Sequence, residues 1–551
     1  MKDFSKEIKA YVLRSSIEFG EVDEKKVLTK LFQYGLDKKD IPEVMKEISK
    51  SVAHVHVMSA GQKEKEFESL KGIIKERVEK EKTLPELKNV SGKVVTRFAP
   101  EPSKYMHLGH AIACLINYTY AKKYNGKFII RFDDCNPEKV SKEYVDSNLD
   151  DLNKYLEVKY DEVKFLSDDM SLFYSYAKDM INKGFAYMCT CEREHMQNLR
   201  HDGKECECRK KSNIKVTLEK WDKFLEGFYA PGTAVLRFRG NMSADNQVMR
   251  DPVLFRLSDK EHFRQGNKYR VWPMYDFYSA VGDSLLGITH VMRTAEFDLR
   301  VELQEEIKKI LGLKTQEFVQ YGRVNVIGAE TQGRTIRESI VNGEYEGWDD
   351  PRLMTLKALK RRGISKDVFV ELINHIGLAK KQVNIDFAMI ASISRKLLDL
   401  KVNRYYFVAN PVELEIKGMP NIKEVEVKMH PDKPFMRKIR IGNKIIISKA
   451  DYDSYLGKEV RLMNLFNMRI NSKDKAEFTE LENNPKIQKI QWVSIGLPVK
   501  IKMDDASWLE GMGEQDIANL KIGEVIQFER FGFVRLDKVV NGVYEFWFSH
   551  K

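Results

Sequence analysis

The chain has 551 residues, of which 42% are hydrophobic and 32% are charged, and its formal net charge is +11. This length is too great for one hydrophobic core and predicts about three to four globular domains. No apolar run reaches the roughly 18 residues that a membrane span needs, and the first residues lack the apolar core of a signal peptide, so we expect a cytoplasmic protein.

Residues 1–88 are predicted to form a helical appendage and a linker. Three segments carry apolar residues at helical spacing, namely KEIKAYVLRSSIEFG, KKVLTKLFQYGL and DIPEVMKEISKSV. The charged run KGIIKERVEKEKTLPELKN, which follows them, favours a linker helix. No group of residues in this region indicates chemistry.

The first segment with chemical content lies at a predicted strand-to-helix junction. Residues 93–98 are β-branched and predict a buried strand, and residues 111–124 predict a helix. His107 and His110 then lie at the helix N-terminus, with Gly109 between them. Free backbone N–H groups, the helix dipole and two imidazoles favour a bound polyphosphate there, and glycine lets it approach the backbone closely. A pair of surface histidines without a ligand is the alternative.

Strands alternate with helices from about residue 89 to residue 190, which predicts a parallel, doubly wound sheet. Arg97 and Asp133 lie at the carboxyl ends of two predicted strands, so both side chains can converge on one ligand. Capping of a turn is the alternative for Asp133 and Asp134. After an insertion, the same sheet is predicted to resume with AVLRFRG, MRDPVLFRL, YRVWPMYDFYSAVGDSLLGITHVMRTAEF and VQYGRVNV.

The insertion, residues 186–270, contains four of the six cysteines in two close pairs. Two such pairs can supply a tetrahedron of thiolates, which is what a structural zinc ion prefers. Disulfides are the competing interpretation, but a reducing cytoplasm disfavours them. His195 or His201 could replace one thiolate. The predicted ligands of Zn²⁺ are Cys189, Cys191, Cys206 and Cys208.

The last two regions are predicted to be helical over residues 326–399 and all-β, in barrels, over residues 400–551. The helical region contains Trp348 and a basic run from Lys357 to Arg362, which would meet nucleic-acid phosphates or form a solvated helix face. The β region mixes aromatic and basic residues, a composition that suits the reading of unpaired RNA bases. The net positive charge fits such a polyanionic partner, although a solvated lysine-rich surface has the same composition.

These segments together resemble a known family. His107-Leu-Gly-His110 resembles the HIGH motif of class I aminoacyl-tRNA synthetases, and RFAPEPS, RFDDCNP, WPMYDF, GITHVMRT and GWDDPR resemble the glutamyl/glutaminyl subgroup in its archaeal and eukaryotic form. The resemblance implies a Rossmann-like α/β catalytic domain over residues 89–325, a helical connective region over 326–399 and anticodon-binding β-barrels over 400–551.

The activity implied is ATP-dependent activation of L-glutamate and its transfer to tRNA(Glu), with Mg²⁺ accompanying ATP. In this subgroup the first step typically needs bound tRNA. Use of tRNA(Gln) as a second substrate is left open, and we expect a monomer. A glutaminyl enzyme and a catalytically weakened tRNA-binding protein are the alternatives.

The resemblance also implies residue roles. Arg293 would pair with the γ-carboxylate of glutamate, because a guanidinium offers no acceptor to an amide; an ion pair with Glu296 or Asp298 is the structural alternative. The amino acid would otherwise be held by Arg97, Asp133 and Tyr275. The residues implied to frame ATP are Glu101, Pro102, Ser103, His107, Gly109 and His110, with Thr294 and Arg323 near the adenosine.

One loop departs from the family. The KMSKS-like loop should lie between residues 325 and 347, and an ungapped alignment places Thr335 where the phosphate-binding lysine is expected. A hydroxyl cannot supply that charge. We therefore predict that Arg334 has the catalytic role of the lysine, with Arg337 as the alternative. Lys104, in place of the usual glycine, is a second departure.

Overall fold

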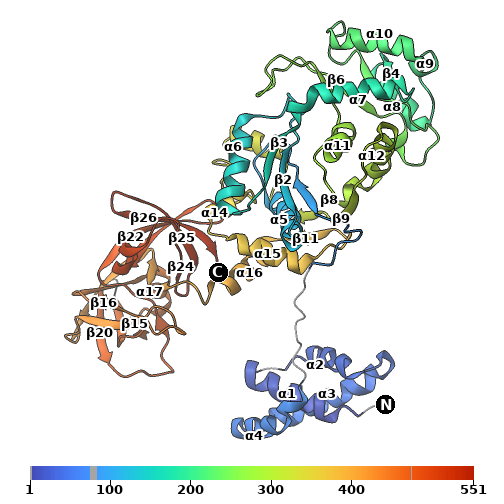
Figure 1. Ribbon diagram of the computed structural model, residues 1–551. Helices are drawn as coiled ribbons and strands as arrows, with labels where there is room; N and C mark the ends of the chain where they lie inside the picture. Colours follow the sequence, from blue (N-terminus) through green and yellow to red (C-terminus); the bar gives the residue numbers. More distant parts are fainter. Residues whose placement is uncertain (1–2, 21, 75–83, 473) are drawn as a thin grey trace. The chain divides into compact units, whose positions relative to one another are not determined.

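A computed structural model describes residues 3–20, 22–74, 84–472 and 474–551 (Figure 1). The chain divides into two compact units, residues 1–82 and 83–551. Within the described residues, every helix is too short or too polar to cross a membrane.

The first unit is a small bundle of helices around its own core. Phe4, Val12, Leu31, Val44 and Ile48 are among its buried residues. Its helices include the three that the sequence predicts. The predicted linker helix falls largely on residues 75–83, which lie outside the described residues. The helices are α1 (Ser5–Phe19), α2 (Glu24–Leu31), α3 (Ile41–His56) and α4 (Ala60–Leu70).

The second unit contains the predicted parallel sheet. Strands β1 (Val95–Phe98), β2 (Lys127–Phe132) and β3 (Glu162–Phe165) are parallel neighbours in that order, and β8 (His290–Thr294) pairs in parallel with β9 (Glu317–Tyr321). Thr289, just before β8, donates its backbone N–H to the Val95 carbonyl at 2.9 Å, which sets β8 beside β1. The strand order therefore reverses between β1 and β8. In open α/β sheets, ligands bind at such a switch point.

The predicted continuation of this sheet is wrong for two of its segments and for the start of a third. AVLRFRG, MRDPVLFRL and the residues YRVWP form β5 (Val235–Phe238), β6 (Val253–Leu257) and β7 (Val271–Pro273), which belong with β4 (Ala186–Cys189) to a separate antiparallel sheet. Both faces of these strands are largely buried, and burial on both faces erases the alternation that marks an antiparallel strand. The helices of this region, around the green part of Figure 1, are α7 (Met170–Asn182), α8 (Arg193–Asp202), α9 (Glu207–Lys210) and α10 (Ile214–Leu225).

Other helices of the second unit accompany the parallel strands or precede the β region in the chain. Helix α5 (Leu108–Lys123) follows β1 and packs against α15. Strand β10 (Val324–Val326) pairs in parallel with β11 (Val383–Ile385). The other helices are α6 (Lys142–Asp150), α11 (Tyr275–Leu285), α12 (Asp298–Leu311), α13 (Gly333–Val341), α14 (Leu356–Arg361), α15 (Lys366–Ile376) and α16 (Phe387–Leu398).

The predicted barrels are confirmed after residue 400. The first and last strands of a seven-stranded sheet are separated along the chain by Tyr406 alone, so the sheet must curl back on itself. Across the sheet its strands are β12 (Arg404–Tyr405), β24 (Val525–Phe528), β25 (Gly532–Val540), β26 (Val543–His550), β22 (Gly496–Lys502), β23 (Trp508–Glu514) and β13 (Phe407–Ala409).

A second, six-stranded sheet also closes. Ile446 at one edge and Val493, just beyond the other edge strand, exchange backbone hydrogen bonds of 2.7 and 2.9 Å. The hairpin of β15 (Glu424–Lys428) and β16 (Met436–Arg440) and helix α17 (Lys449–Tyr455) accompany it. Across the sheet its strands are β17 (Lys444–Ser448), β14 (Pro411–Lys417), β20 (Lys475–Glu480), β19 (Asn467–Ser472), β18 (Glu459–Leu462) and β21 (Lys489–Ile490).

The end of the basic run joins α14 to the first barrel. Arg361 makes two hydrogen bonds to Asp537, at 3.1 and 2.7 Å, and Arg362 is only 4% exposed. The Arg362 guanidinium donates to the backbone carbonyls of Pro351, Phe548 and Ser549. At these two positions the run therefore forms neither a solvated face nor a surface for nucleic acid.

Candidate active site and metal centre

A cavity of about 420 Å³ lies at the switch point, between the carboxyl ends of β1 and β8 and the N-terminus of α5. Its volume is in the range of small-molecule sites. Most of the predicted ligand-binding residues line it, whereas Pro102, Ser103 and Arg334 do not. Those that line it are Arg97, Glu101, His107, Gly109, His110, Asp133, Tyr275, Arg293, Thr294 and Arg323.

The two histidines build the first turn of α5. Nδ1 of His107 accepts the Gly109 N–H at 3.1 Å, and Nδ1 of His110 accepts the His107 N–H at 3.2 Å. Because Nδ1 is the acceptor in both rings, the proton of each neutral imidazole is on Nε2. Gly109 lies close to His107, and a Cβ at this position would come within 3.0 Å of the imidazole ring.

Both rings are neutral near pH 7. Burial, aided by the neighbouring Lys104 ammonium, lowers the pKa of His110 to about 3. Burial also lowers the pKa of His107 well below its ordinary value, and the charges of His110 and Lys104 act in the same direction. The histidines therefore face the cavity as neutral hydrogen-bond donors.

The Pro-Glu-Pro turn positions Glu101 at the cavity. The Ser103 N–H donates to the Glu101 carbonyl at 2.8 Å, and the Ser103 hydroxyl donates to the Glu101 carboxylate at 3.0 Å. Pro102 is buried, and its carbonyl accepts the Ser141 N–H. Pro102 and Ser103 thus shape the turn without lining the cavity.

A chain of buried charges supports the side of the cavity that Arg97 and Asp133 form. Arg97 donates from Nε to Asp283 at 2.8 Å, Asp283 also accepts from Arg131 at 2.6 Å, and Arg131 donates twice to Asp133 at 2.7 and 3.1 Å. Two arginines and two aspartates balance one another. Although burial alone would raise the pKa of Asp283, the guanidinium groups of Arg97 and Arg131 hold it at about 2.

Arg131 and Asp283 were missed as site-supporting residues. Each carries a charge within an apolar run, KFIIRF in β2 and YSAVGDSLL in α11. A charge at a core position of a strand or helix was the available signal, because such a charge needs a buried partner. Gly282 leaves room beside Arg131, since a Cβ there would lie 3.4 Å from its Nη1 and 2.9 Å from Leu166. Asp134, by contrast, accepts from the Ser167 N–H and hydroxyl, so its role is structural.

Arg293 is short of hydrogen-bond acceptors. It is 6% exposed, and its Nη1 donates to Gln304 at 2.9 Å and to the Tyr275 hydroxyl at 3.3 Å. Its Nε and Nη2 are buried and have no hydrogen-bond partner in the described part of the chain. Neither Glu296 nor Asp298 pairs with it there; Glu296 accepts from Arg323 and Asp298 from Lys380. A buried guanidinium in this state favours an acidic ligand.

The region of the predicted KMSKS-like loop contributes Thr331 and Gln332 to the cavity wall. Arg334 lies in the first turn of α13 with its side chain 86% exposed, and it donates to Glu338 at 2.8 Å on the same helix. Lys104, for which no role was predicted, lines the cavity.

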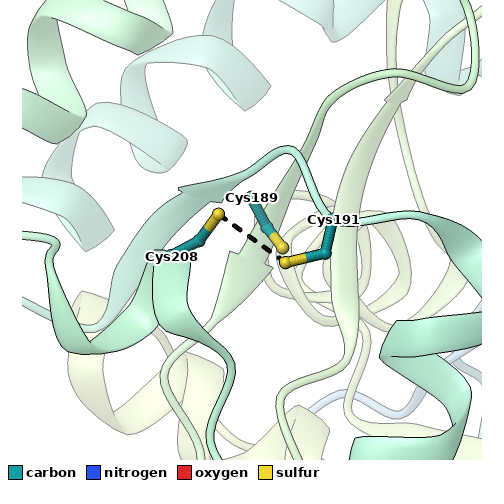
Figure 2. Close-up of side chains that lie close together, drawn as sticks. All are labelled: Cys189, Cys191 and Cys208. Atoms are coloured by element: carbon teal, nitrogen blue, oxygen red, sulfur yellow. Dashed lines mark hydrogen bonds between the residues drawn. The ribbon is translucent and has the colours of Figure 1, made fainter.

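The four cysteines come together in the insertion. The sulfurs of Cys189, Cys191 and Cys208 lie within 4.8 Å of one another, and their side chains gather in one place (Figure 2). Cys206 lies beside this group but outside it, with its Sγ 3.9 Å from that of Cys189, and the sulfurs of Cys191 and Cys208 are 3.7 Å apart. Sulfurs bound to one tetrahedral zinc ion at about 2.3 Å lie ~3.8 Å apart. The three grouped thiols therefore suit zinc in type and spacing, and Cys206 is the nearby candidate for the fourth position.

The electrostatics of the cluster also suit a metal. A hydrogen bond from the Cys189 thiol lowers the pKa of Cys206 to about 4, and the same bond raises the pKa of Cys189. Nη1 of Arg237 lies 3.6 Å from the Cys206 sulfur, so a cation offsets thiolate charge. His195 and His201 are exposed, and the metal-ligand group found among the described residues includes neither.

Comparisons with known proteins show the family of the chain. The family described as "tRNA synthetases class I (E and Q), catalytic domain" matches residues 93–400, and two families described as "tRNA synthetases class I (E and Q), anti-codon binding domain" match residues 402–486 and 478–537.

Two curated relatives span the whole chain. A protein named glutamate--tRNA ligase from Pyrococcus abyssi is 39% identical over 569 aligned positions, covering 98% of each chain. One of the same name from Nitrosopumilus maritimus is 37% identical over 575 aligned positions, covering 100% of each. A solved glutamate-tRNA synthetase from Elizabethkingia anophelis is 19% identical, with a TM-score of 0.40, over 56% of this chain and 72% of that one. The chain belongs to the class I tRNA synthetase family of the E and Q type.

Proposed function

We propose that this protein is a glutamate–tRNA ligase, which activates L-glutamate with ATP and transfers it to the 3′ end of tRNA(Glu). The observation that carries the proposal is Arg293 at the wall of the cavity, whose buried Nε and Nη2 find no acceptor among the described residues. A γ-carboxylate accepts both N–H groups, whereas the amide of glutamine would add donors where acceptors are needed. The full-length curated relatives carry the same activity in their names.

In the first step, a carboxylate oxygen of glutamate's α-carboxylate attacks the α-phosphorus of ATP. The bond to the bridging oxygen breaks, and pyrophosphate leaves with the electron pair. In the second step, a terminal ribose hydroxyl of tRNA attacks the acyl carbon and AMP leaves. Mg²⁺, which accompanies ATP in this family, neutralises charge on the pyrophosphate.

The residues contribute by positioning and by charge. His107 and His110 present neutral Nε2–H groups at the N-terminus of α5, where oxyanions are favoured, and Gly109 lets phosphate approach the backbone. Glu101, Thr294 and Arg323 are assigned to the nucleotide. Tyr275 supports Arg293, Arg97 faces the amino-acid carboxylate and Asp133 faces the α-ammonium. No covalent nucleophile is needed.

Aminoacylation with each amino acid tests the function. Purified protein, ATP and total tRNA should charge labelled glutamate and leave labelled glutamine uncharged. Charging of glutamine alone would contradict the proposal. Charging of neither, with retained tRNA binding, would favour the weakened tRNA-binding protein, which the assembled cavity argues against.

The four cysteines are proposed to hold one structural Zn²⁺, as a knuckle that faces the tRNA acceptor end. The expected metal content is one zinc per chain. Cys191→Ser should lower this content and the melting temperature of the insertion. Cys114→Ala is the matched control, since Cys114 is buried in the catalytic core away from the cluster and its variant should keep the zinc. Full zinc content in Cys191→Ser would reject the ligand assignment.

Several finer points belong to the same proposal. We assign residues 1–88 to an appendage and linker, 89–325 to the catalytic domain with its insertion at 186–270, 326–399 to the connective region and 400–551 to anticodon binding. The protein acts as a cytoplasmic monomer. Charging assays with purified tRNA(Gln) and tRNA(Glu) will decide whether it accepts one tRNA or both.

A further inference from the structure

Among the described residues, the predicted KMSKS-like loop places no cation in the cavity wall at the proposed phosphate end. Arg334 and Arg337 are exposed and do not line the wall, although the charge of Arg337 is near enough to help lower the pKa of Lys104. Thr331 and Gln332, which line the wall, are uncharged. Arg334 points into solvent, where Glu338 neutralises it. ATP carries its largest charge at this end, so a cation from another element is needed.

Lys104 is placed to supply this positive charge. It follows the Pro-Glu-Pro-Ser turn, lines the cavity, and its Nζ lies 3.5 Å from Nε2 of His107 and 3.5 Å from the Thr331 carbonyl. Within the described residues no carboxylate lies within ion-pair distance of its ammonium. Two other cations of the cavity wall are already paired, Arg97 with Asp283 and Arg323 with Glu296.

The contact between Lys104 and His107 joins two donors. Nδ1 of His107 accepts from the Gly109 N–H, so Nε2 of the neutral ring carries a proton. A lysine ammonium can only donate. Lys104 donates one N–H to the Thr331 carbonyl, and its other N–H groups and the Nε2–H of His107, 3.5 Å away, can donate together to an anionic oxygen placed between them.

The loop is shaped to admit this lysine. Gly333, directly after Gln332, packs on the aliphatic stem of Lys104, and a Cβ at Gly333 would lie 3.0 Å from both Cβ and Cδ of the lysine. A larger residue at 333 would push the ammonium away from His107. The glycine at position 333 thus leaves the space that the Lys104 side chain occupies.

We propose that Lys104 binds the phosphates of ATP in the activation step, and so supplies from the turn after β1 the charge that Thr335 cannot supply from the loop. This role rests on the proposed function, because the polyphosphate is that of the ATP consumed. It makes Lys104 a catalytic residue that touches substrate, in place of Arg334.

The first test is tRNA-dependent exchange of pyrophosphate into ATP with glutamate. Lys104→Met keeps the aliphatic stem and removes the charge, and should lower kcat about 10²- to 10³-fold, as loss of one oxyanion donor does. Lys104→Arg should recover part of the loss. Lys142→Met is the matched control, because Lys142 is exposed on α6 and paired with Asp146, and it should stay within twofold of wild type.

The second test separates phosphate binding from folding. Lys104→Met should weaken ATP binding about 10-fold or more and leave adenosine binding within twofold, since adenosine has no phosphates. A misfolded site would lose both ligands.

The outcomes are distinct. Normal exchange by Lys104→Met, with a large loss in Arg334→Ala, overturns the role of Lys104 and restores Arg334. Equal loss of ATP and adenosine binding also overturns it. Failure of the wild-type protein to exchange with glutamate would sink the proposed function instead, and the ATP-to-adenosine comparison would still judge Lys104.

Discussion

The two ends of the cavity differ in whether their charged groups have partners within the protein. At the amino-acid end, Arg97, Asp283, Arg131 and Asp133 form a buried chain in which each charge has a fixed partner. At the proposed phosphate end, the one acceptor that the described residues give Lys104 is the Thr331 carbonyl, and its Nζ lies 3.5 Å from the Nε2–H of His107. The buried chain is complete without substrate, whereas the donors of Lys104 and His107 are proposed to be completed by it.

This difference tells which residues serve stability and which serve binding. Substituting a residue whose hydrogen-bond partners all lie within the protein should lower the free energy of unfolding, because the substitution leaves a buried charge without a partner. Substituting a residue whose donors await a ligand should instead lower the rate of catalysis. Arg293 has internal partners for Nη1 and none for Nε and Nη2, so it lies at the boundary between the two.

The largest expected effect is that of Asp283→Ala. It removes the carboxylate that pairs with Arg97 and leaves Arg131 with Asp133 alone, and should cost about 3–5 kcal/mol of unfolding free energy. Glu424→Ala, which removes an exposed pair with Lys438, is the control and should cost less than about 1 kcal/mol. Urea unfolding followed by intrinsic fluorescence measures both. Equal costs would show that the buried chain does not set the stability of this end.

The substitution Arg293→Met tests whether Arg293 serves substrate binding or the stability of the fold. Loss of a buried, charge-paired contact with the γ-carboxylate should reduce kcat/KM for glutamate about 10²- to 10³-fold. The melting temperature of the free protein should barely change, because two unpartnered N–H groups leave the core. Arg293→Lys keeps the charge without the planar fork and should recover little activity. A fall in stability like that of Asp283→Ala would mean that Arg293 is structural.

The smallest effect is a pH dependence from the phosphate end. The pKa of His110 is about 3 in the folded protein, below its ordinary value near 6.5. The unfolded chain therefore takes up this proton first, so stability is full above pH 6.5 and falls as the pH drops toward 3. Thermal melts between pH 7 and pH 4.5 should show the decline, and His110→Asn should make it shallower. An unchanged slope would assign the decline to other groups.

Local patterns predicted the elements that carry the histidines. The strand before the Pro-Glu-Pro turn and the helix after it depend on neighbouring residues alone, and both are present as β1 and α5. The partners of β5 and β6 could not be predicted in this way, because the direction of a neighbouring strand is a long-range property. The closure of the barrels was predicted from short strands at regular spacing.

Within the site, residues on recognisable motifs were predicted and their supports were not. Arg131 and Asp283 lie 152 positions apart along the chain, and nothing local to either indicates the other. The sequence alone does not explain Lys104, because its contact with Gly333 joins residues that are far apart along the chain. The prediction for Arg334 stays open to the exchange assay, although its side chain turns away from the cavity.

The junction at Arg362 has a mechanical consequence. The buried guanidinium of Arg362 donates to Pro351 on one side and to Phe548 and Ser549 on the other. These hydrogen bonds fasten the connective helices to the first barrel. Pivoting at this point would leave the cation buried with its acceptors withdrawn, which costs several kcal/mol on the scale of broken buried pairs. The junction between the connective region and the first barrel is therefore rigid, and a displacement of the barrel would displace α14 as well.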